Sequence, residues 1–181
     1  MNKNTNSQTG TTLSRASVKL AMTAVMSALI AVTTMVAVPM PPPLSTITLA
    51  PVAIFVAGIL MGPLPALVAS IFGSGLGFIG GANIGTINVP PGFFSIFLIG
   101  IIVSRGPMGF TVGLLRKVDI ILAMSIGVLA ETLIFFVLDW YLFGFSVALI
   151  TLGTLLDLIF VPVGYLVIKA IRSMWNVNKL E

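Results

Sequence analysis

The sequence contains no cysteine and no histidine. These two absences exclude disulfide bridges, thiolate nucleophiles, Cys/His zinc sites and acid–base chemistry by an imidazole. A phosphate-binding loop with its lysine is also missing, so the chain has no evident machinery for nucleotide hydrolysis. We therefore expect neither a metal nor a cofactor.

Charged residues are scarce as well, at 8% of the chain, whereas 57% of the residues are hydrophobic. A soluble globular domain carries about 25% charged residues, so a soluble chain of 181 residues would need far more charge than this. The composition therefore predicts a single domain, over residues 15–172, built as a helical bundle whose outer surface meets the lipid bilayer.

The few basic residues lie in three short segments beside the apolar runs. Lysine and arginine in short loops mark the cytoplasmic side of a membrane protein. Thin clusters of this kind predict topology rather than a nucleic-acid surface, so we expect no nucleic-acid partner. The nine residues are Lys3, Arg15 and Lys19, then Arg105, Arg116 and Lys117, and finally Lys169, Arg172 and Lys179.

Six apolar segments predict an all-α, six-helix transmembrane bundle with both ends in the cytoplasm, in the plasma membrane. The segment that ends at residue 104 is short, since 13 residues cover only about 20 Å of a core about 30 Å thick. We expect that helix to be tilted, re-entrant or extended by the connector that follows it. Polar residues 1–14 predict a flexible cytoplasmic tail, and residues 173–181 a second cytoplasmic tail. The expected helices cover residues 15–38, 49–60, 64–79, 92–104, 118–138 and 146–168.

Glu131 and Asp157 lie in the middle of apolar runs, at similar expected depth in neighbouring antiparallel helices. A carboxylate at mid-membrane costs at least about 2.5 kcal/mol and faces a protein interior or a cavity. Three interpretations stay open: a protonated or hydrogen-bonded structural acid, a ligand contact in a polar cavity, and a proton relay. Gly127 and Gly153, each four residues earlier, would open space beside the two acids.

Because every lysine and arginine is expected outside the membrane, no basic residue is expected to neutralise these acids. The hypothesis that follows is a ligand with a cationic or hydrogen-bond-donating group.

The first apolar segment carries small residues at helical spacing. Such residues let helices approach closely, within the bundle or against a membrane partner. The sequence alone leaves both uses open. The positions are Ala21, Ala24, Ala28 and Ala31.

A glycine-rich motif, GLGFIG, lies at residues 75–80 and matches a dinucleotide-binding fingerprint. Because it lies inside an apolar segment, we interpret it as close helix packing.

The sequence resembles the substrate-binding S-component of energy-coupling factor (ECF) vitamin transporters. Three stretches carry the resemblance: KLAMTAVMSALIAV at 19–32, followed by a proline-rich loop, TLAP at 48–51, and GILMGPLPALVA at 58–69. The similarity is plain over residues 15–80 and extends to 172 by the pattern of spans alone.

The resemblance implies a protein without enzymatic activity that captures a vitamin or related micronutrient in a pocket opening outward. Uptake would be driven by a separate transmembrane coupling protein and two ATPase subunits. The coupling protein would dock on Ala24 and Ala28, with Ala21 and Ala31 extending that face. The loop over residues 41–48 would act as a lid. The resemblance places pocket residues at Asn83, Asn88, Glu131, Trp140 and Asp157.

No signature for riboflavin, thiamine, biotin or folate is apparent, so the ligand stays open. The main alternative is a stand-alone secondary transporter that uses Glu131 and Asp157 for proton coupling. Many such transporters contain inverted repeats, and residues 15–80 and 105–172 show no convincing repeat of one another. A membrane scaffold without transport activity is the third possibility, and it would leave the two acids hard to justify.

Overall fold

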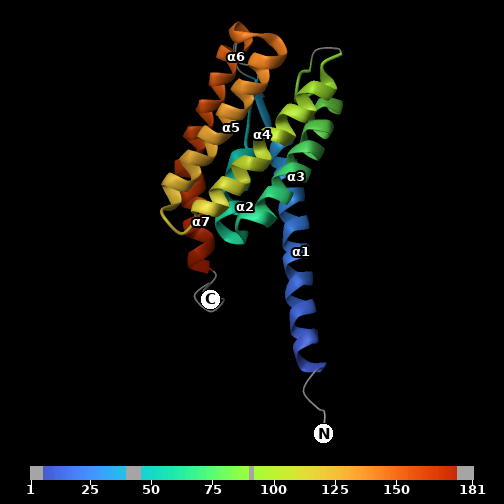
Figure 1. Cartoon of the computed structure of the whole chain (residues 1–181), viewed down its shortest axis with the longest axis vertical. Helices are drawn as coiled ribbons and strands as arrows, with labels where there is room; N and C mark the ends of the chain where they lie inside the picture. Colours follow the sequence, from blue (N-terminus) through green and yellow to red (C-terminus); the bar gives the residue numbers. More distant parts are fainter. Residues whose placement is uncertain (1–5, 40–45, 90–91, 175–181) are drawn as a thin grey trace.

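The apolar segments form helices that run side by side in a bundle (Figure 1). The computed structural model describes residues 6–39, 46–89 and 92–174. Within these ranges one small hairpin, β1 (Ala37–Pro39) and β2 (Thr46–Thr48), accompanies the helices. The helices are α1 (Asn6–Met35), α2 (Ala50–Met61), α3 (Pro63–Asn83), α4 (Phe94–Leu115), α5 (Ile120–Phe143), α6 (Phe145–Thr151), the 3₁₀ helix η1 (Leu152–Ile159) and α7 (Phe160–Met174).

In the described part of the chain six helical segments alternate in direction through the bundle, where α6, η1 and α7 together count as one segment of 30 residues. Five of the segments are long and apolar enough to cross a membrane, whereas α2 has only 12 residues. The beginning of α1, the α4–α5 turn and the end of α7 lie at the same end of the bundle (Figure 1). The prediction of an all-α, multi-pass membrane bundle is therefore confirmed.

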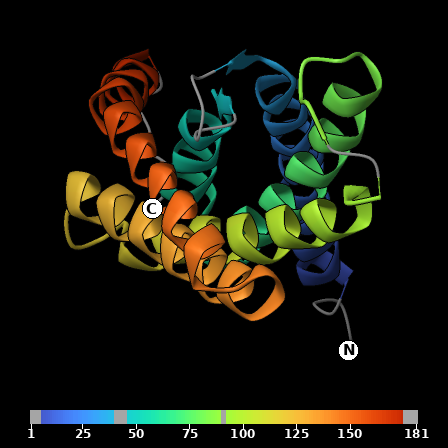
Figure 2. The ribbon, with the colours of Figure 1, turned by 90° about the horizontal axis from the view of Figure 1, so that it is seen from above.

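The short helix α2 lies in the centre of the bundle, between α1 and α7 when the molecule is seen from above (Figure 2). Most of its residues are buried, including Ile54 and Phe55. A helix that is apolar all round suits a site covered by protein on every side. Because protein surrounds it, α2 does not need to match the thickness of the bilayer by itself.

Several predicted boundaries differ from the observed ones. The predicted flexible tail over residues 1–14 is wrong from Asn6 onward, because α1 begins there. The predicted helix 92–104 and the connector after it form one helix, α4, of 22 residues and about 33 Å. Pro107 lies inside this helix without ending it, as transmembrane helices allow when neighbouring groups satisfy the freed carbonyl. Residues 1–5 and 175–181 of the predicted tails lie outside the described residues.

Part of the predicted external loop after the first helix is paired backbone. β1 and β2 are antiparallel, with Val38 opposite Ile47, and the Leu49 amide donates a hydrogen bond to the Val36 carbonyl (3.3 Å). Residues 41–45 of the predicted lid lie outside the described residues. The hairpin holds Thr48, which is buried, over the interior of the bundle.

Glycines bring α1, α3 and α4 into close contact. A β-carbon on Gly77 of α3 would lie 2.6 Å from the backbone oxygen of Ala31 on α1. A β-carbon on Gly113 of α4 would lie equally close to the Pro63 backbone at the start of α3. The interpretation of the motif at residues 75–80 as close packing is therefore confirmed for Gly77.

This close approach predicts unequal effects of the same substitution at two glycines. Gly77→Ala should lower stability by about 1–3 kcal/mol, because the new methyl group overlaps the α1 backbone. Gly100→Ala is the matched control, since its β-carbon would meet only a Phe135 ring carbon at 3.5 Å. Thermal unfolding in detergent micelles measures both. Equal melting temperatures for the two variants would contradict the close α1–α3 contact.

Candidate functional site

Arg105 lies halfway along α4, about 16 Å from the first residue of that helix. Its side chain is buried, with 8% of the residue exposed. The expectation that every basic residue lies in a cytoplasmic segment is therefore wrong for Arg105. The expectation of no basic residue within the membrane to neutralise the two acids is wrong for the same reason. The pair Gly106–Pro107 suggested a helix end at a place where the helix in fact continues.

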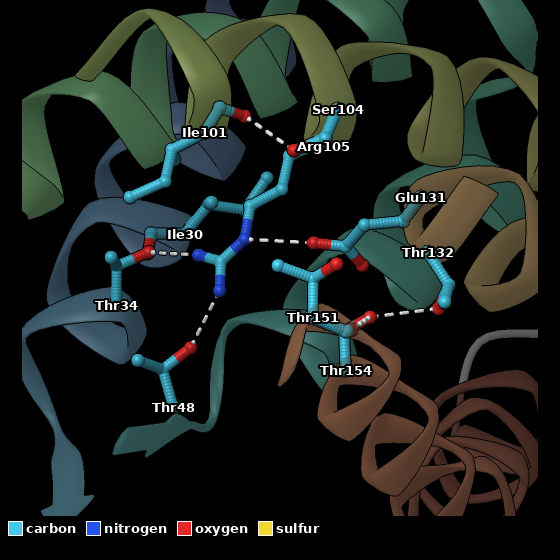
Figure 3. A network of polar contacts seen from close by, with 10 residues as sticks. All are labelled: Ile30, Thr34, Thr48, Ile101, Ser104, Arg105, Glu131, Thr132, Thr151 and Thr154. Atoms are coloured by element: carbon cyan, nitrogen blue, oxygen red, sulfur yellow. Dashed lines mark hydrogen bonds and ion pairs between the residues drawn. The ribbon is translucent and has the colours of Figure 1, made fainter. Parts of the chain in front are cut away.

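The guanidinium of Arg105 joins three other elements of the fold (Figure 3). Its Nε donates to Glu131 Oε1 on α5 at 3.2 Å. Its Nη1 donates to Thr34 Oγ1 on α1 at 3.3 Å, and its Nη2 donates to Thr48 Oγ1 on β2 at 2.9 Å. Each of the three nitrogen atoms therefore has an acceptor supplied by the protein.

These contacts place an ion pair where a lone charge would be costly. Removing one partner of a buried pair costs about 3–5 kcal/mol, because the remaining charge is left uncompensated. The Thr34 hydroxyl reaches Arg105 from the part of α1 that packs against Gly77. The close α1–α3 contact and the Arg105 network are therefore parts of one arrangement.

Glu131 uses only one of its carboxylate oxygens in this network. The residue is 1% exposed, and its Oε2 is buried without a hydrogen-bond partner among the described residues. A buried polar atom without a partner is uncommon in native structures and calls for an explanation. Oε2 is therefore the first atom of the site that is left to bind something else.

Asp157 is the second carboxylate of the site. It is buried, with 8% exposed, and lies within electrostatic range of Glu131 and Arg105. Within the described part of the chain, its side chain makes no hydrogen bond or ion pair shown by the structure. Glu131 and Asp157 were predicted at similar depth, and the structure places them within electrostatic range of each other, with Arg105 as an unforeseen third member.

The 3₁₀ geometry of η1 explains how Asp157 comes to face α5. Side chains three residues apart are eclipsed in a 3₁₀ helix, so Thr154 and Asp157 share one face, in line with Thr151 just before η1. The hydroxyls of Thr154 and Thr132 are hydrogen-bonded at 2.9 Å. Thr132 follows Glu131 directly, so this bond holds the Asp157 face of η1 beside the free carboxylate oxygen.

The structure places the other predicted pocket residues elsewhere. Asn83 ends α3, and with Asn88 it lines a hollow of about 270 Å³ in the α3–α4 loop. Trp140 is 55% exposed and packs against Phe136 and Phe145. Trp140 follows Glu131 by nine residues, which at 100° per residue puts it on the opposite face of α5. A role of these three residues in binding stays a prediction.

The alanines of α1 divide into two groups. Ala21, Ala24 and Ala28 are exposed, whereas Ala31 is 8% exposed and packs against α3. Gly127 also packs rather than opening space beside Glu131, because its missing β-carbon points at Val112 of α4. The exposed small-residue face therefore consists of three alanines.

Sequence reasoning missed Arg105, Thr34 and Thr48. One signal could have found Arg105: the residues on both sides of it are apolar over a length sufficient for a single span, if Pro107 is read as internal to a helix. Nothing in the sequence indicates that Thr34 and Thr48 meet the same guanidinium, because they lie 71 and 57 residues away from it.

The site combines charged and hydrogen-bonding side chains inside an apolar bundle. Among the described residues, the buried charged side chains are Arg105, Glu131 and Asp157. The described part of the chain contains no group of three or more acidic, histidine or cysteine residues that could hold a metal ion. Comparisons with protein-family models, curated proteins and solved structures find no match to this chain.

The ion pair predicts a strong energetic coupling between two helices. Arg105→Gln and Glu131→Gln should each lower the free energy of unfolding by about 3–5 kcal/mol, since each leaves a buried charge alone. The double variant should lose much less than the sum of the two. Unfolding measured in the same detergent gives the coupling, and Lys117→Gln, at an exposed position, is the control. Additive losses would show that the two side chains do not act as a pair.

Proposed function

We propose that this chain is the solute-binding subunit of an ECF-type importer, which captures a vitamin or related micronutrient at the plasma membrane. The observation that carries the proposal is the buried cluster of Arg105, Glu131 and Asp157 halfway across an apolar bundle. Ionisable residues within membrane spans are costly and mark sites of function by default. The chain itself performs no chemistry on the solute.

The composition of the cluster supports binding rather than a purely structural role. Arg105 and Glu131 alone would form a balanced pair that joins α4 to α5. Asp157 adds a second buried carboxylate, and Glu131 Oε2 remains without a partner in the described part of the molecule. A bundle that needed only stability would gain nothing from this excess of acceptors.

The outer surface supports a role as one subunit among several. The chain lacks a nucleotide-binding loop, so energy for uptake would come from other proteins. Ala21, Ala24 and Ala28 form an exposed strip on α1, and small residues of this kind favour close approach of another helix. The proposed partner on this strip is a transmembrane coupling protein, which would connect the chain to two ATPase subunits.

Copurification tests the proposed assembly. Wild-type protein extracted from its native membrane should bring down a membrane partner and ATPase subunits. Ala24→Trp combined with Ala28→Trp should abolish this, because the two indoles prevent close helix contact. Leu133→Trp with Leu166→Trp is the control, since it places the same bulk on exposed positions of α5 and α7.

Two outcomes would contradict the proposal. Recovery of the same partners by both double variants would show that the α1 strip is not the docking surface. Solute-driven proton flux into liposomes that contain this chain alone would favour the stand-alone transporter, with Glu131 and Asp157 as its proton-carrying groups.

A further inference from the structure

Each nitrogen atom of the Arg105 guanidinium already donates to a protein acceptor. Arg105 directs Nε, Nη1 and Nη2 at Glu131, Thr34 and Thr48. One N–H on each Nη has no partner shown among the described residues, but the positive charge that an anionic solute would need is already paired with Glu131. Arg105 binds groups of the protein itself, in contrast to sites where a free guanidinium binds the carboxylate or phosphate of a ligand.

Two carboxyl groups of the site have acceptor oxygens that make no hydrogen bond in the described part of the chain. Glu131 Oε2 is buried and has no partner among the described residues, and Asp157 makes no hydrogen bond shown by the structure there. Oε2 turns away from Arg105, on the side where Thr151 and Thr154 lie (Figure 3). The 3₁₀ face that carries Thr154 also carries Asp157, so both free acceptors belong to the sides of α5 and η1 that face each other.

The charges of the cluster do not balance. Arg105 contributes one positive charge, whereas Glu131 and Asp157 contribute two carboxyl groups, and no other charged side chain is buried among the described residues. A second ionised carboxylate in an apolar interior is unfavourable unless it takes up a proton or a cation compensates it. The site therefore lacks a hydrogen-bond donor and a positive charge, and a group that supplies both would complete it.

We infer that the solute carries a positively charged, hydrogen-bond-donating group, such as a protonated amine, an amidine or a cationic amino-heterocycle, that binds between Glu131 Oε2 and Asp157. This inference rests on the proposed function, because it names the chemical class of the captured solute. Arg105 then has a positioning role: it fixes Glu131 through Oε1 and leaves Oε2 for the solute. The hypothesis of a cationic solute therefore has a different basis from the one in the sequence. A basic residue, Arg105, is present within the bundle, but it is already paired with Glu131.

The unequal roles of the two acids can be tested without any solute. Glu131→Gln should lower the melting temperature of washed protein, because Arg105 loses its counter-charge. Asp157→Asn should leave the melting temperature unchanged or raise it, because it removes the uncompensated carboxyl group. A fall for Asp157→Asn as large as that for Glu131→Gln, or failure of this variant to fold, would show that Asp157 belongs to the structural pair and would overturn the inference.

A matched set of probes tests the solute class directly. Benzamidine, benzamide and benzoate share a ring and differ in charge, and methylammonium and guanidinium extend the cations to smaller sizes. A ligand that binds only the folded state raises the melting temperature in proportion to its occupancy. We expect at least one cation to raise it by about 2 °C or more in wild-type protein, and this shift to disappear in Asp157→Asn but not in Asp139→Asn.

The outcomes separate this inference from the proposed function. No shift with any cation, a shift with benzoate at least as large, or an unchanged cation shift in Asp157→Asn would each overturn the inference. Recovery of ATPase subunits together with any of these results would keep the importer proposal and remove only the solute class. A cation shift without such partners would keep the site and remove the importer.

Discussion

The burial of Arg105 is the constraint on which the arrangement of the bundle depends. A guanidinium halfway along a membrane-spanning helix requires acceptors on several sides, and it obtains them from α1, β2 and α5. Each acceptor comes from a different part of the chain, so one side chain ties four elements together. The hairpin that follows α1 has a defined place for this reason, since Thr48 completes the set.

Close packing of the helices positions the hydrogen-bond partners of Arg105. Glycines let α3 approach α1 and α4 closely, which brings Thr34 within reach of Arg105. The short helix α2 fills the centre and is covered by α1, α3, α4 and α7. The segment from α6 to α7 changes to 3₁₀ geometry at mid-span, and this change aligns Asp157 with Thr154 on the face toward α5. Mid-helix 3₁₀ segments often occur at functional positions.

Composition and the spacing of apolar runs were sufficient to predict the fold class, the number of helical segments and the similar depth of Glu131 and Asp157. These features depend on hydrophobicity and helix length, which are local properties. Arg105 was misplaced because Gly106 and Pro107 are helix breakers in water but are tolerated inside a membrane span. Its partners Thr34 and Thr48 depend on contacts distant in sequence, and the η1 geometry depends on tertiary packing, so neither could be predicted from the chain alone.

The central claim is that Glu131 Oε2 and Asp157 together bind a solute. The most direct measurement is mass spectrometry of the small molecules extracted from protein purified gently from its native membrane. The account predicts one molecule retained by the wild type and by Asp139→Asn, which alters an acid farther along α5, and lost from Asp157→Asn. Retention of the same molecule by Asp157→Asn, or no retained molecule in the wild type, would contradict it.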